Sequence, residues 1–285
     1  MKSIVVFGST GQLANELRDI SKLKKKYHFH FISRNEVNFQ SEVEIKNYFT
    51  NLLPKDTFGI INAVAYTAVD LAESEIVTAK SINTVAPGII SEKCNQHGIK
   101  FVHISTDFVF DGQKCTSYHE TDTKNPLSVY GKTKSEGEDL VLQNDKNAII
   151  IRTSWVYSKY GKNFLKTILR LASERQEISV VEDQIGSPTW ANDLAQVSLE
   201  AIDSSQAGIF HFSNEGVASW YDFAYEIVSQ AKKNCKVKPI PSLSYPTPAR
   251  RPSFSVLNKT KIRNSFQFQN YHWKDRIPLV LSELN

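Results

Sequence analysis

The chain lacks several features that would place it in a specialised class of protein. Only three of its 285 residues are cysteines, Cys94, Cys115 and Cys235, which lie far apart and form no C-x-x-C pair. This argues against a disulfide framework and a zinc site, and it fits a reducing cytosol. No apolar run approaches the ~20 residues of a membrane span, and the run before Gly8 is too short for a signal peptide. We therefore expect a cytoplasmic protein without a membrane partner.

A strong charge of either sign is also missing. The formal net charge is +4, and the one basic run, at residues 22–26, falls where the first predicted helix ends. Cations there complement the helix dipole, a role that we favour over nucleic-acid binding, so we expect no nucleic-acid partner. His28 and His30 share one face of a predicted strand, but no third ligand is identifiable nearby, and plain strand residues are the favoured interpretation.

Five strand-like runs alternate with segments of helical periodicity. The predicted strands cover 3–7, 28–33, 58–62, 100–105 and 148–152. The predicted helices cover 12–24, 42–53, 69–97 in one or two pieces that end at Gly98, and 130–143. The alternation predicts an α/β fold with a Rossmann-type, doubly wound parallel sheet.

The pattern becomes looser after about residue 154. Helical stretches at 163–173, 192–203 and 221–232 are separated by short apolar runs such as 178–181 and 209–212. A length of 285 residues fits one or two domains of about 150 residues each. We expect residues 1–154 to bind a dinucleotide and carry the catalytic residues. Residues 155–285 are expected to form a smaller, partly interleaved α/β domain over the mouth of the sheet.

A glycine turn follows the first predicted strand and leads into a helix. It contains Gly8, Thr10 and Gly11 in the spacing G-x-x-G-x-x-A. Gly8 suits the tight turn, Gly11 lets a pyrophosphate approach the backbone, and the helix N-terminus then offers free N–H groups. The turn indicates a dinucleotide cofactor, with an ordinary strand-to-helix turn as the alternative.

The end of the second predicted strand bears on the choice of cofactor. An NAD site places a carboxylate there for the ribose hydroxyls, whereas the 2′-phosphate of NADP needs a cation. The strand ends in Ser33 and Arg34, with no carboxylate before Glu36. Arg34 therefore favours NADPH, while NADH and an ordinary surface role for the arginine stay open.

A candidate catalytic set follows the fourth predicted strand. Thr106 ends that strand, and Tyr130 and Lys134 lie four residues apart on one face of the next helix. An ammonium beside a phenol lowers its pKa from about 10 toward neutrality, which makes it a usable proton donor and acceptor. Such a pair also occurs on solvated helix faces, but here a glycine turn and a hydroxyl residue accompany it.

Longer segments are similar to a known family. They lie at residues 8–13, 62–70, 105–112, 186–189 and 251–252 and are spread over nearly the whole chain. They resemble the extended short-chain dehydrogenases/reductases, and within these the reductases of dTDP-linked 4-keto-6-deoxy sugars. Ala14 departs from the usual third glycine of the turn. Some relatives hold magnesium between subunits through glutamates. Glu16 matches one of these, but Asn192 stands where another would be, so no metal is predicted.

The resemblance implies roles for individual residues. Gly11, Gln12 and Leu13 would line the cofactor pyrophosphate, and Tyr130 and Lys134 would also touch the nicotinamide ribose. The segment after the third strand would lie beside the adenine ribose and nicotinamide; it consists of Ala65, Tyr66 and Thr67.

The resemblance also implies a substrate site. Thr106 and Asp107 would meet the sugar, and Trp155 would offer an aromatic wall, with a core aromatic as the alternative. Asn163 could contact the substrate diphosphate, although we favour a helix N-cap. Arg250 and Arg251 could reach a phosphate, with plain loop positions as the alternative.

The residues after Thr106 favour one reaction. The related dehydratases follow their threonine with an Asp-Glu pair, whereas Asp107 is followed by Phe108. The resemblance thus implies NAD(P)H-dependent reduction of the C4 ketone of dTDP-4-dehydro-L-rhamnose to dTDP-L-rhamnose, for cell-surface polysaccharides. A reductase or epimerase of another nucleotide sugar stays open. So does a non-catalytic NADP-binding regulatory subunit like that of methionine adenosyltransferase, and so does a homodimer.

Overall fold

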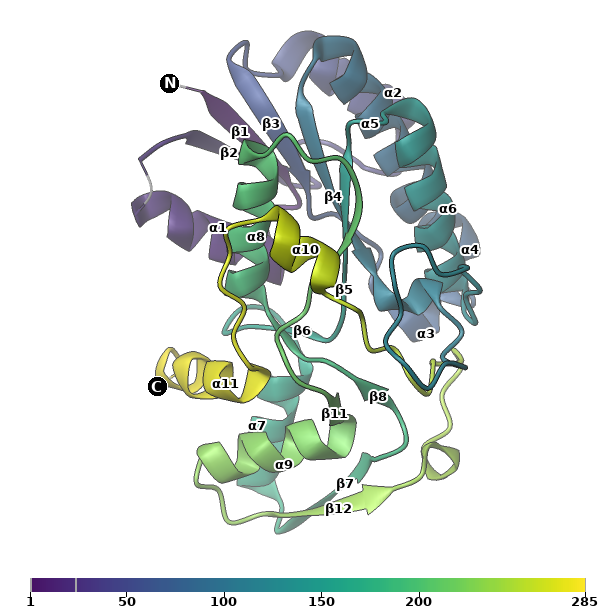
Figure 1. The fold of residues 1–285 in the computed structure, drawn as a ribbon, viewed down its shortest axis with the longest axis vertical. Helices are drawn as coiled ribbons and strands as arrows, with labels where there is room; N and C mark the ends of the chain where they lie inside the picture. Colours follow the sequence, from purple (N-terminus) through teal and green to yellow (C-terminus); the bar gives the residue numbers. More distant parts are fainter. Residues whose placement is uncertain (1, 24, 285) are drawn as a thin grey trace.

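The computed structural model describes residues 2–23 and 25–284, and this part of the chain is organised around a six-stranded sheet (Figure 1). The strand order is β10-β5-β4-β3-β1-β2, and all neighbouring strands run parallel. The strands are β1 (Ser3–Phe7), β2 (His28–Ile32), β3 (Thr57–Asn62), β4 (Lys100–Thr106), β5 (Ile149–Thr153) and β10 (Gly208–His211). The predicted α/β fold with a doubly wound parallel sheet is confirmed.

Helices cover both faces of the sheet, which explains why its central strands are buried and mostly apolar. One face carries α1 (Gln12–Leu23), α8 (Ala191–Asp203) and α10 (Thr260–Ser265). The other carries α2 (Glu42–Asn47), the π-helix η1 (Tyr48–Leu52), α5 (Ala86–His97) and α6 (Val129–Asn144). Lys24, part of the predicted basic run, lies outside the described residues.

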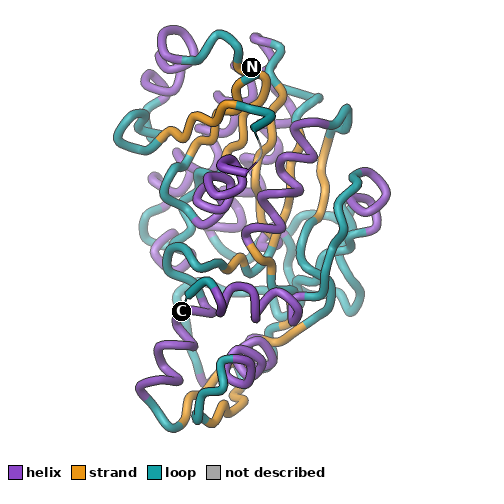
Figure 2. The backbone as a smooth tube through the Cα atoms, turned by 90° about the vertical axis from the view of Figure 1, so that its left-hand side faces the viewer, coloured by secondary structure: helices purple, strands orange, loops and turns teal. Residues whose placement is uncertain are grey.

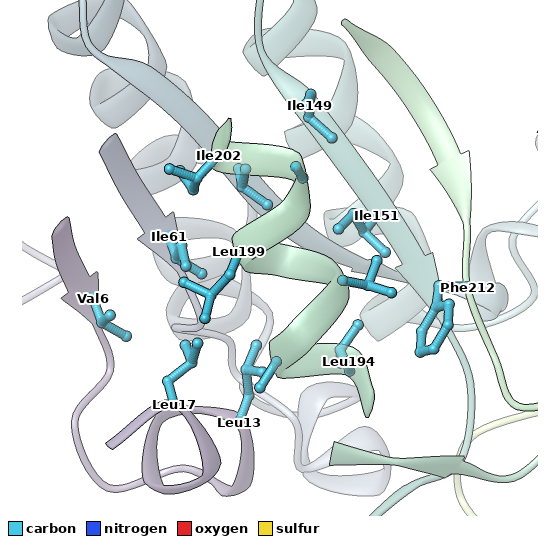
Figure 3. Packing of buried hydrophobic residues seen from close by; sticks show 14 of the residues in the cluster. Val6, Leu13, Leu17, Ile61, Ile149, Ile151, Leu194, Leu199, Ile202 and Phe212 are labelled. Atoms are coloured by element: carbon cyan, nitrogen blue, oxygen red, sulfur yellow. The ribbon is translucent and has the colours of Figure 1, made fainter. Parts of the chain in front are cut away.

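The first face has a tightly packed core. Figure 3 shows Leu13 and Leu17 of α1 and Leu194 of α8 gathered against strand residues that include Ile61 and Ile151. Leu13 and Leu17 are one helical turn apart, so α1 presents a continuous apolar stripe to the sheet. This packing fixes the start of α1, and with it the glycine turn, at the edge of the sheet.

The segment predicted as one or two helices over 69–97 is divided further. It forms α3 (Val69–Ala72), α4 (Ile76–Lys80), the π-helix η2 (Ser81–Val85) and α5. Gly98 ends α5 as predicted, with a left-handed φ of +62° and its N–H bonded to Asn95 O at 3.2 Å. The wider turns of η2 place Asn83 toward the third strand, a detail that helical periodicity does not show.

A second group of elements lies beyond the carboxyl ends of the strands, in the lower part of Figures 1 and 2. It has its own apolar core. Its helices are α7 (Phe164–Glu174), α9 (Trp220–Gln230) and α11 (Trp273–Ser282). Its paired strands are β6 (Val156–Tyr157) with β9 (Thr189–Trp190), β7 (Glu177–Val181) with β12 (Lys236–Ile240), and β8 (Ile185–Gly186) with β11 (Ala218–Ser219). Short 3-10 helices η3 (Asp107–Val109) and η4 (Ser242–Ser244) complete the described elements.

Three elements from residues 155–285, α8, β10 and α10, pack in or on the main sheet. β10 pairs with β5, and α8 packs beside α1 (Figure 3). Segments after residue 154 thus supply one strand of the main sheet and part of the helical cover of one of its faces. The apolar run 209–212 could not indicate which sheet it joins, because a short buried run reads the same in either.

The strand order reverses direction beside β1, which lies between β2 and β3. In open α/β sheets, ligands bind beyond the carboxyl ends of the strands at such a switch point. The carboxyl ends of β1, β3, β4 and β5 lead directly into the predicted site residues. Within the described residues, no helix has the length and apolarity needed to cross a bilayer.

Candidate active site

The glycine turn lies where β1 and β3 end side by side. Gly8 has φ +99°, and a Cβ there would come within 3.1 Å of the Ala63 carbonyl carbon. A larger residue would therefore strain the backbone and push β1 away from β3. At Gly11, by contrast, a Cβ would meet only Gly8 O, at 4.0 Å. The space over Gly11 is open on the side where a phosphate would approach.

Polar side chains hold the turn in shape. Asn15 donates to Thr10 O at 3.1 Å and to Gly11 O at 3.0 Å, and Arg18 donates to Ser9 O at 3.0 Å. The first N–H groups of α1, from Gln12 onward, have no partner within the helix and carry its positive dipole end. This donor set suits a dinucleotide diphosphate.

The predicted pyrophosphate residues Gln12 and Leu13 differ in what they can offer. The Leu13 side chain is buried in the core beneath the sheet, so only its backbone faces the turn. Gln12 donates to Val156 O at 3.2 Å and accepts from Asn163 Nδ2 at 2.9 Å. Gln12 thus connects the glycine turn to the second group of elements.

Arg34 lies exposed just beyond β2. The nearest carboxylate in sequence, Glu36, accepts from both the N–H and the hydroxyl of Ser33 at 2.8 Å. These bonds lower the pKa of Glu36, with the backbone bond as the largest cause. The Glu36 carboxylate is therefore already hydrogen-bonded within the local turn. The exposed Arg34 is the cation that the end of β2 could offer to a 2′-phosphate.

The segment after β3 is held by a residue that the sequence did not single out. Asn83 of η2 accepts from Tyr66 N at 2.9 Å and donates to Tyr66 O at 3.2 Å. The Tyr66 hydroxyl donates to Glu75 at 2.7 Å. Ala65 and Thr67 flank this fixed point, and Thr67 is exposed. The only hint of this role in the sequence is that Asn83 is a polar amide inside a segment of helical periodicity.

Thr106 and Tyr130 lie near each other, at the end of β4 and the start of α6. The Ser128 hydroxyl caps α6 by accepting from Gly131 N at 3.2 Å. A Cβ at Gly131 would lie 2.3 Å from Phe108 O, so glycine lets the helix start lie against the chain that follows β4. The Tyr130 ring then packs edge-on against Phe108, with centroids 5.6 Å apart, which places the half-buried phenol close to Thr106 at the end of β4.

The electrostatic state of Tyr130 differs from the expectation. Burial raises its pKa to about 12, with a further increase from Asp107, and the nearby Thr106 hydroxyl only partly offsets this. The prediction that Lys134 lowers this pKa toward neutrality is thus wrong for the protein without ligands. The physical reason is the direction of the lysine, because Nζ of Lys134 donates to Ile104 O at 2.6 Å instead of meeting the phenol.

Lys134 is almost completely buried, at 1% exposure. Burial lowers the pKa of its amine to about 8, although the Glu138 carboxylate acts in the opposite direction. Its second contact is Nε2 of His103, at 3.2 Å. Helical spacing correctly placed Lys134 near Tyr130, but it gave no information on the strand groups that bind Nζ.

Asp107 is a buried acid that directly follows Thr106 at the carboxyl end of β4. Its Oδ1 accepts from Thr106 at 3.1 Å, whereas Oδ2 is buried without a hydrogen-bond partner among the described residues. Burial raises the pKa of Asp107 to about 6, although the neighbouring polar groups, among them the Thr106 hydroxyl, act in the opposite direction. The unpaired oxygen suits a sugar hydroxyl, which would donate to it.

Trp155 forms an aromatic wall with a partner that sequence reasoning missed. It stacks on Trp220, with ring centroids 3.6 Å apart and planes at 8°. Its φ of +49° is unusual for a bulky residue, and such backbone strain often occurs at functional sites. A Cβ at Gly186 would lie 2.7 Å from the indole, so the small residue there makes room for the wall.

Two other predicted contacts have structural roles. Asn163 caps α7 by accepting from Lys166 N at 3.0 Å, so the favoured N-cap interpretation is confirmed. Arg251 forms an ion pair with Asp70, with its Nη2 2.8 Å from Oδ2. Arg251 therefore joins the C-terminal segment to the chain after β3, while Arg250 is exposed.

The candidate metal residues form no cluster. Glu16 accepts from Asn192 Nδ2 at 3.0 Å, and burial raises the pKa of its carboxyl. In the described part of the chain, no group of three or more His, Cys, Asp or Glu side chains is arranged to hold a metal.

Comparison with known proteins decides the family. The model of the RmlD substrate binding domain family matches residues 1–285. The chain belongs to this family. It is 37% identical over 286 residues to the dTDP-4-dehydrorhamnose reductase of Aggregatibacter actinomycetemcomitans, and the match covers 96% of each chain.

Solved structures give the same result. The crystal structure of a dTDP-4-dehydrorhamnose reductase from Clostridium acetobutylicum has a TM-score of 0.94 and 35% identity, covering 100% of this chain and 99% of that one. The enzyme of that name from Bacillus anthracis, in complex with NADP, has a TM-score of 0.93 and 35% identity. That match covers 99% of this chain and 100% of the other. The family resemblance predicted from the sequence is confirmed.

Proposed function

We propose that this protein reduces the C4 ketone of dTDP-4-dehydro-L-rhamnose to dTDP-L-rhamnose with NADPH, in the cytoplasm, to supply cell-surface polysaccharides. The observation that carries the proposal is the placement of Tyr130 against Phe108, beside Thr106 at the end of β4, at the carboxyl ends of the strands where the glycine turn also lies. The names of the full-length relatives and the NADP complex of one of them support the substrate and cofactor.

The cofactor is assigned to residues 1–154. The turn residues Gly8, Thr10, Gly11, Gln12 and Leu13 would surround the diphosphate, mostly through backbone groups. Arg34 would contact the 2′-phosphate. The ribose and nicotinamide would lie along Ala65, Tyr66, Thr67, Tyr130 and Lys134. When bound, NADPH supplies the hydride for C4.

The chain's own residues hold the sugar and supply the proton. The raised pKa keeps the Tyr130 phenol protonated at neutral pH, which is the form able to donate to the developing alkoxide. Thr106 orients the phenol, and Asp107 offers its unpaired oxygen to a sugar hydroxyl. Trp155, supported by Trp220, would close one side of the site, with residues 155–285 providing most of the nucleotide-sugar contacts.

The direct test follows NADPH absorbance while the purified protein meets a panel of 4-keto nucleotide sugars, with product identification. We expect fastest turnover with dTDP-4-dehydro-L-rhamnose and formation of dTDP-L-rhamnose. Preference for another sugar would indicate a related reductase or epimerase instead. Tight NADPH binding without turnover of any sugar, together with a stable complex with another enzyme, would indicate a regulatory subunit. Light scattering would distinguish a monomer from a homodimer.

A further inference from the structure

A chain of hydrogen bonds connects β3, β4 and α6 beneath the candidate site. Asn62 and His103 are register partners on β3 and β4. Val64 N donates to Asn62 Oδ1 at 3.1 Å, and Asn62 Nδ2 lies 3.1 Å from His103 Nδ1. His103 Nε2 lies 3.2 Å from Lys134 Nζ, which donates to Ile104 O at 2.6 Å. We call this series, from Val64 N to Ile104 O, the donor chain.

The donor chain is closed to solvent. Asn62 is 1% exposed, His103 0% and Lys134 1%. Buried polar groups need partners inside the protein, because an unmade or donor-to-donor contact costs about 1–3 kcal/mol. Each donor in the chain must therefore meet an acceptor, and each acceptor must meet a donor.

The Val64 end fixes the direction of the first two bonds. A backbone N–H can only donate, so the oxygen of Asn62 faces Val64 and its NH₂ group faces His103. An NH₂ group also only donates, so Nδ1 of His103 accepts and carries no proton. Burial lowers the pKa of His103 well below its usual range, which leaves the ring neutral. A neutral ring without a proton on Nδ1 carries it on Nε2.

The Lys134 end is then determined. The Nε2–H of His103 points at Nζ, and an ammonium has three donors and no acceptor. A neutral amine accepts through its lone pair and still donates to Ile104 O. The complete chain is satisfied only with a neutral amine at Lys134.

We propose that His103 is a positioning residue that holds Lys134 as a neutral amine at mildly alkaline pH in the cofactor-free protein, with the direction of its bond set by Asn62. This deepens the proposed function, because the state of Lys134 matters to ketone reduction only if the protein is that reductase. If Lys134 became an ammonium, Nε2 of His103 would have to accept from it, so the ring proton would move to Nδ1. The Asn62 amide would then have to flip, so that its oxygen faces Nδ1. Val64 N–H would then face an NH₂ group.

The surroundings of Lys134 agree with this state. Glu138, one turn further along α6, is the charged group acting on Lys134, and its carboxylate is bound by Arg152 of β5. Two other acids lie nearby but are engaged elsewhere. The Asp107 carboxylate of η3 raises the pKa of Tyr130, and Glu73, after α3, accepts a hydrogen bond from Val129 N at 2.9 Å. The amine pKa of about 8 is in accord with a largely uncharged group above that pH. The donor chain also explains why Lys134 does not acidify the phenol.

The first test needs no variant. Long-range ¹H–¹⁵N NMR of the cofactor-free protein, labelled at histidine, reports which ring nitrogen of His103 is protonated at mildly alkaline pH, above the pKa of about 8 of the Lys134 amine. We expect a proton on Nε2 and none on Nδ1. A proton on Nδ1 would overturn the proposal, since Nε2 would then accept from a lysine ammonium.

The second test reverses the chain. In Asn62→Asp both side-chain oxygens accept, so Val64 N–H stays satisfied while His103 must donate from Nδ1. We expect the His103 proton to move to Nδ1 and the Lys134 pKa, measured by NMR of labelled lysine, to rise by about one pH unit or more. A higher lysine pKa with the proton still on Nε2 would reflect only the added charge and would contradict the donor chain.

These readouts separate the inference from the proposed reaction. The tautomer is measured without cofactor or sugar, so a wrong tautomer refutes the donor chain whatever the activity is. A correct tautomer in a protein that reduces no 4-keto sugar refutes the reductase assignment and leaves the donor chain intact.

Discussion

Glu138 of α6 and Arg152 of β5 form a two-point ion pair in the interior of the protein, with Nη2–Oε2 at 2.7 Å and Nε–Oε1 at 2.9 Å. Ser105 of β4 donates to the same carboxylate at 2.5 Å. Burial would raise the pKa of Glu138, but Arg152 reverses this and the net pKa is lowered. The pair thus ties the catalytic helix to two strands of the sheet.

Removing one charge of this pair leaves the other buried and unpaired. We expect Glu138→Gln to lower the free energy of unfolding by about 3–5 kcal/mol. Urea denaturation measures this loss. The matched control is Glu174→Gln, which removes an exposed pair with Arg170 and should change stability by about 0.5 kcal/mol or less. Equal losses in the two variants would contradict the structural role of the buried pair.

Asp107 makes stability depend on pH in a defined direction. Its folded-state pKa is raised to about 6 from 3.8, so the folded state binds the proton more tightly than the unfolded state. This contribution is complete below the unfolded pKa and is lost as pH rises through about 6. Asp107→Asn should therefore gain stability relative to the parent protein between about pH 4.5 and about pH 7.5, by at most about 3 kcal/mol.

Urea titrations of both proteins at several pH values measure this difference, with the exposed Asp275→Asn as control. A difference between parent and Asp107→Asn that stays constant with pH would show that the carboxyl is not held in its protonated form. The same variant should bind the nucleotide sugar more weakly if Oδ2 accepts a sugar hydroxyl.

Arg34 is expected to determine the preference for NADPH over NADH. Arg34→Ala should weaken NADPH binding about tenfold, equivalent to about 1.4 kcal/mol, and leave NADH binding nearly unchanged. Only NADPH carries the 2′-phosphate, so the ratio of the two dissociation constants is the readout. Arg175→Ala, an exposed cation at the end of α7, controls for net charge. An equal loss of affinity for NADPH and NADH would contradict the assignment of Arg34 to the 2′-phosphate.

Much of the fold could be predicted because the relevant signals are local. Strands buried on both faces read as unbroken apolar runs, and the ends of β1 and α5 are marked by Gly8 and Gly98. The place of β10 could not be predicted, since pairing with β5 is a long-range choice. The division of 69–97 into four segments likewise depends on packing against α6.

The candidate site was predictable in position but not in electrostatics. Spacing placed Tyr130 and Lys134 on one face of α6, and the end of the fourth predicted strand indicated Thr106, which lies beside Tyr130 in the structure. The direction of Lys134 depends on His103 and Ile104 of β4, which meet Nζ because α6 packs against that strand. Trp220 was missed because its contact with Trp155 joins segments 65 residues apart in sequence.

The most direct measurement of the central claim is the rate of NADPH oxidation with dTDP-4-dehydro-L-rhamnose in Tyr130→Phe. Loss of the phenol hydroxyl removes the proposed proton donor, while the ring and its packing against Phe108 remain. We predict that kcat falls by two or more powers of ten and that NADPH binding is retained. A variant that reduces the ketone at nearly the parent rate would contradict the account.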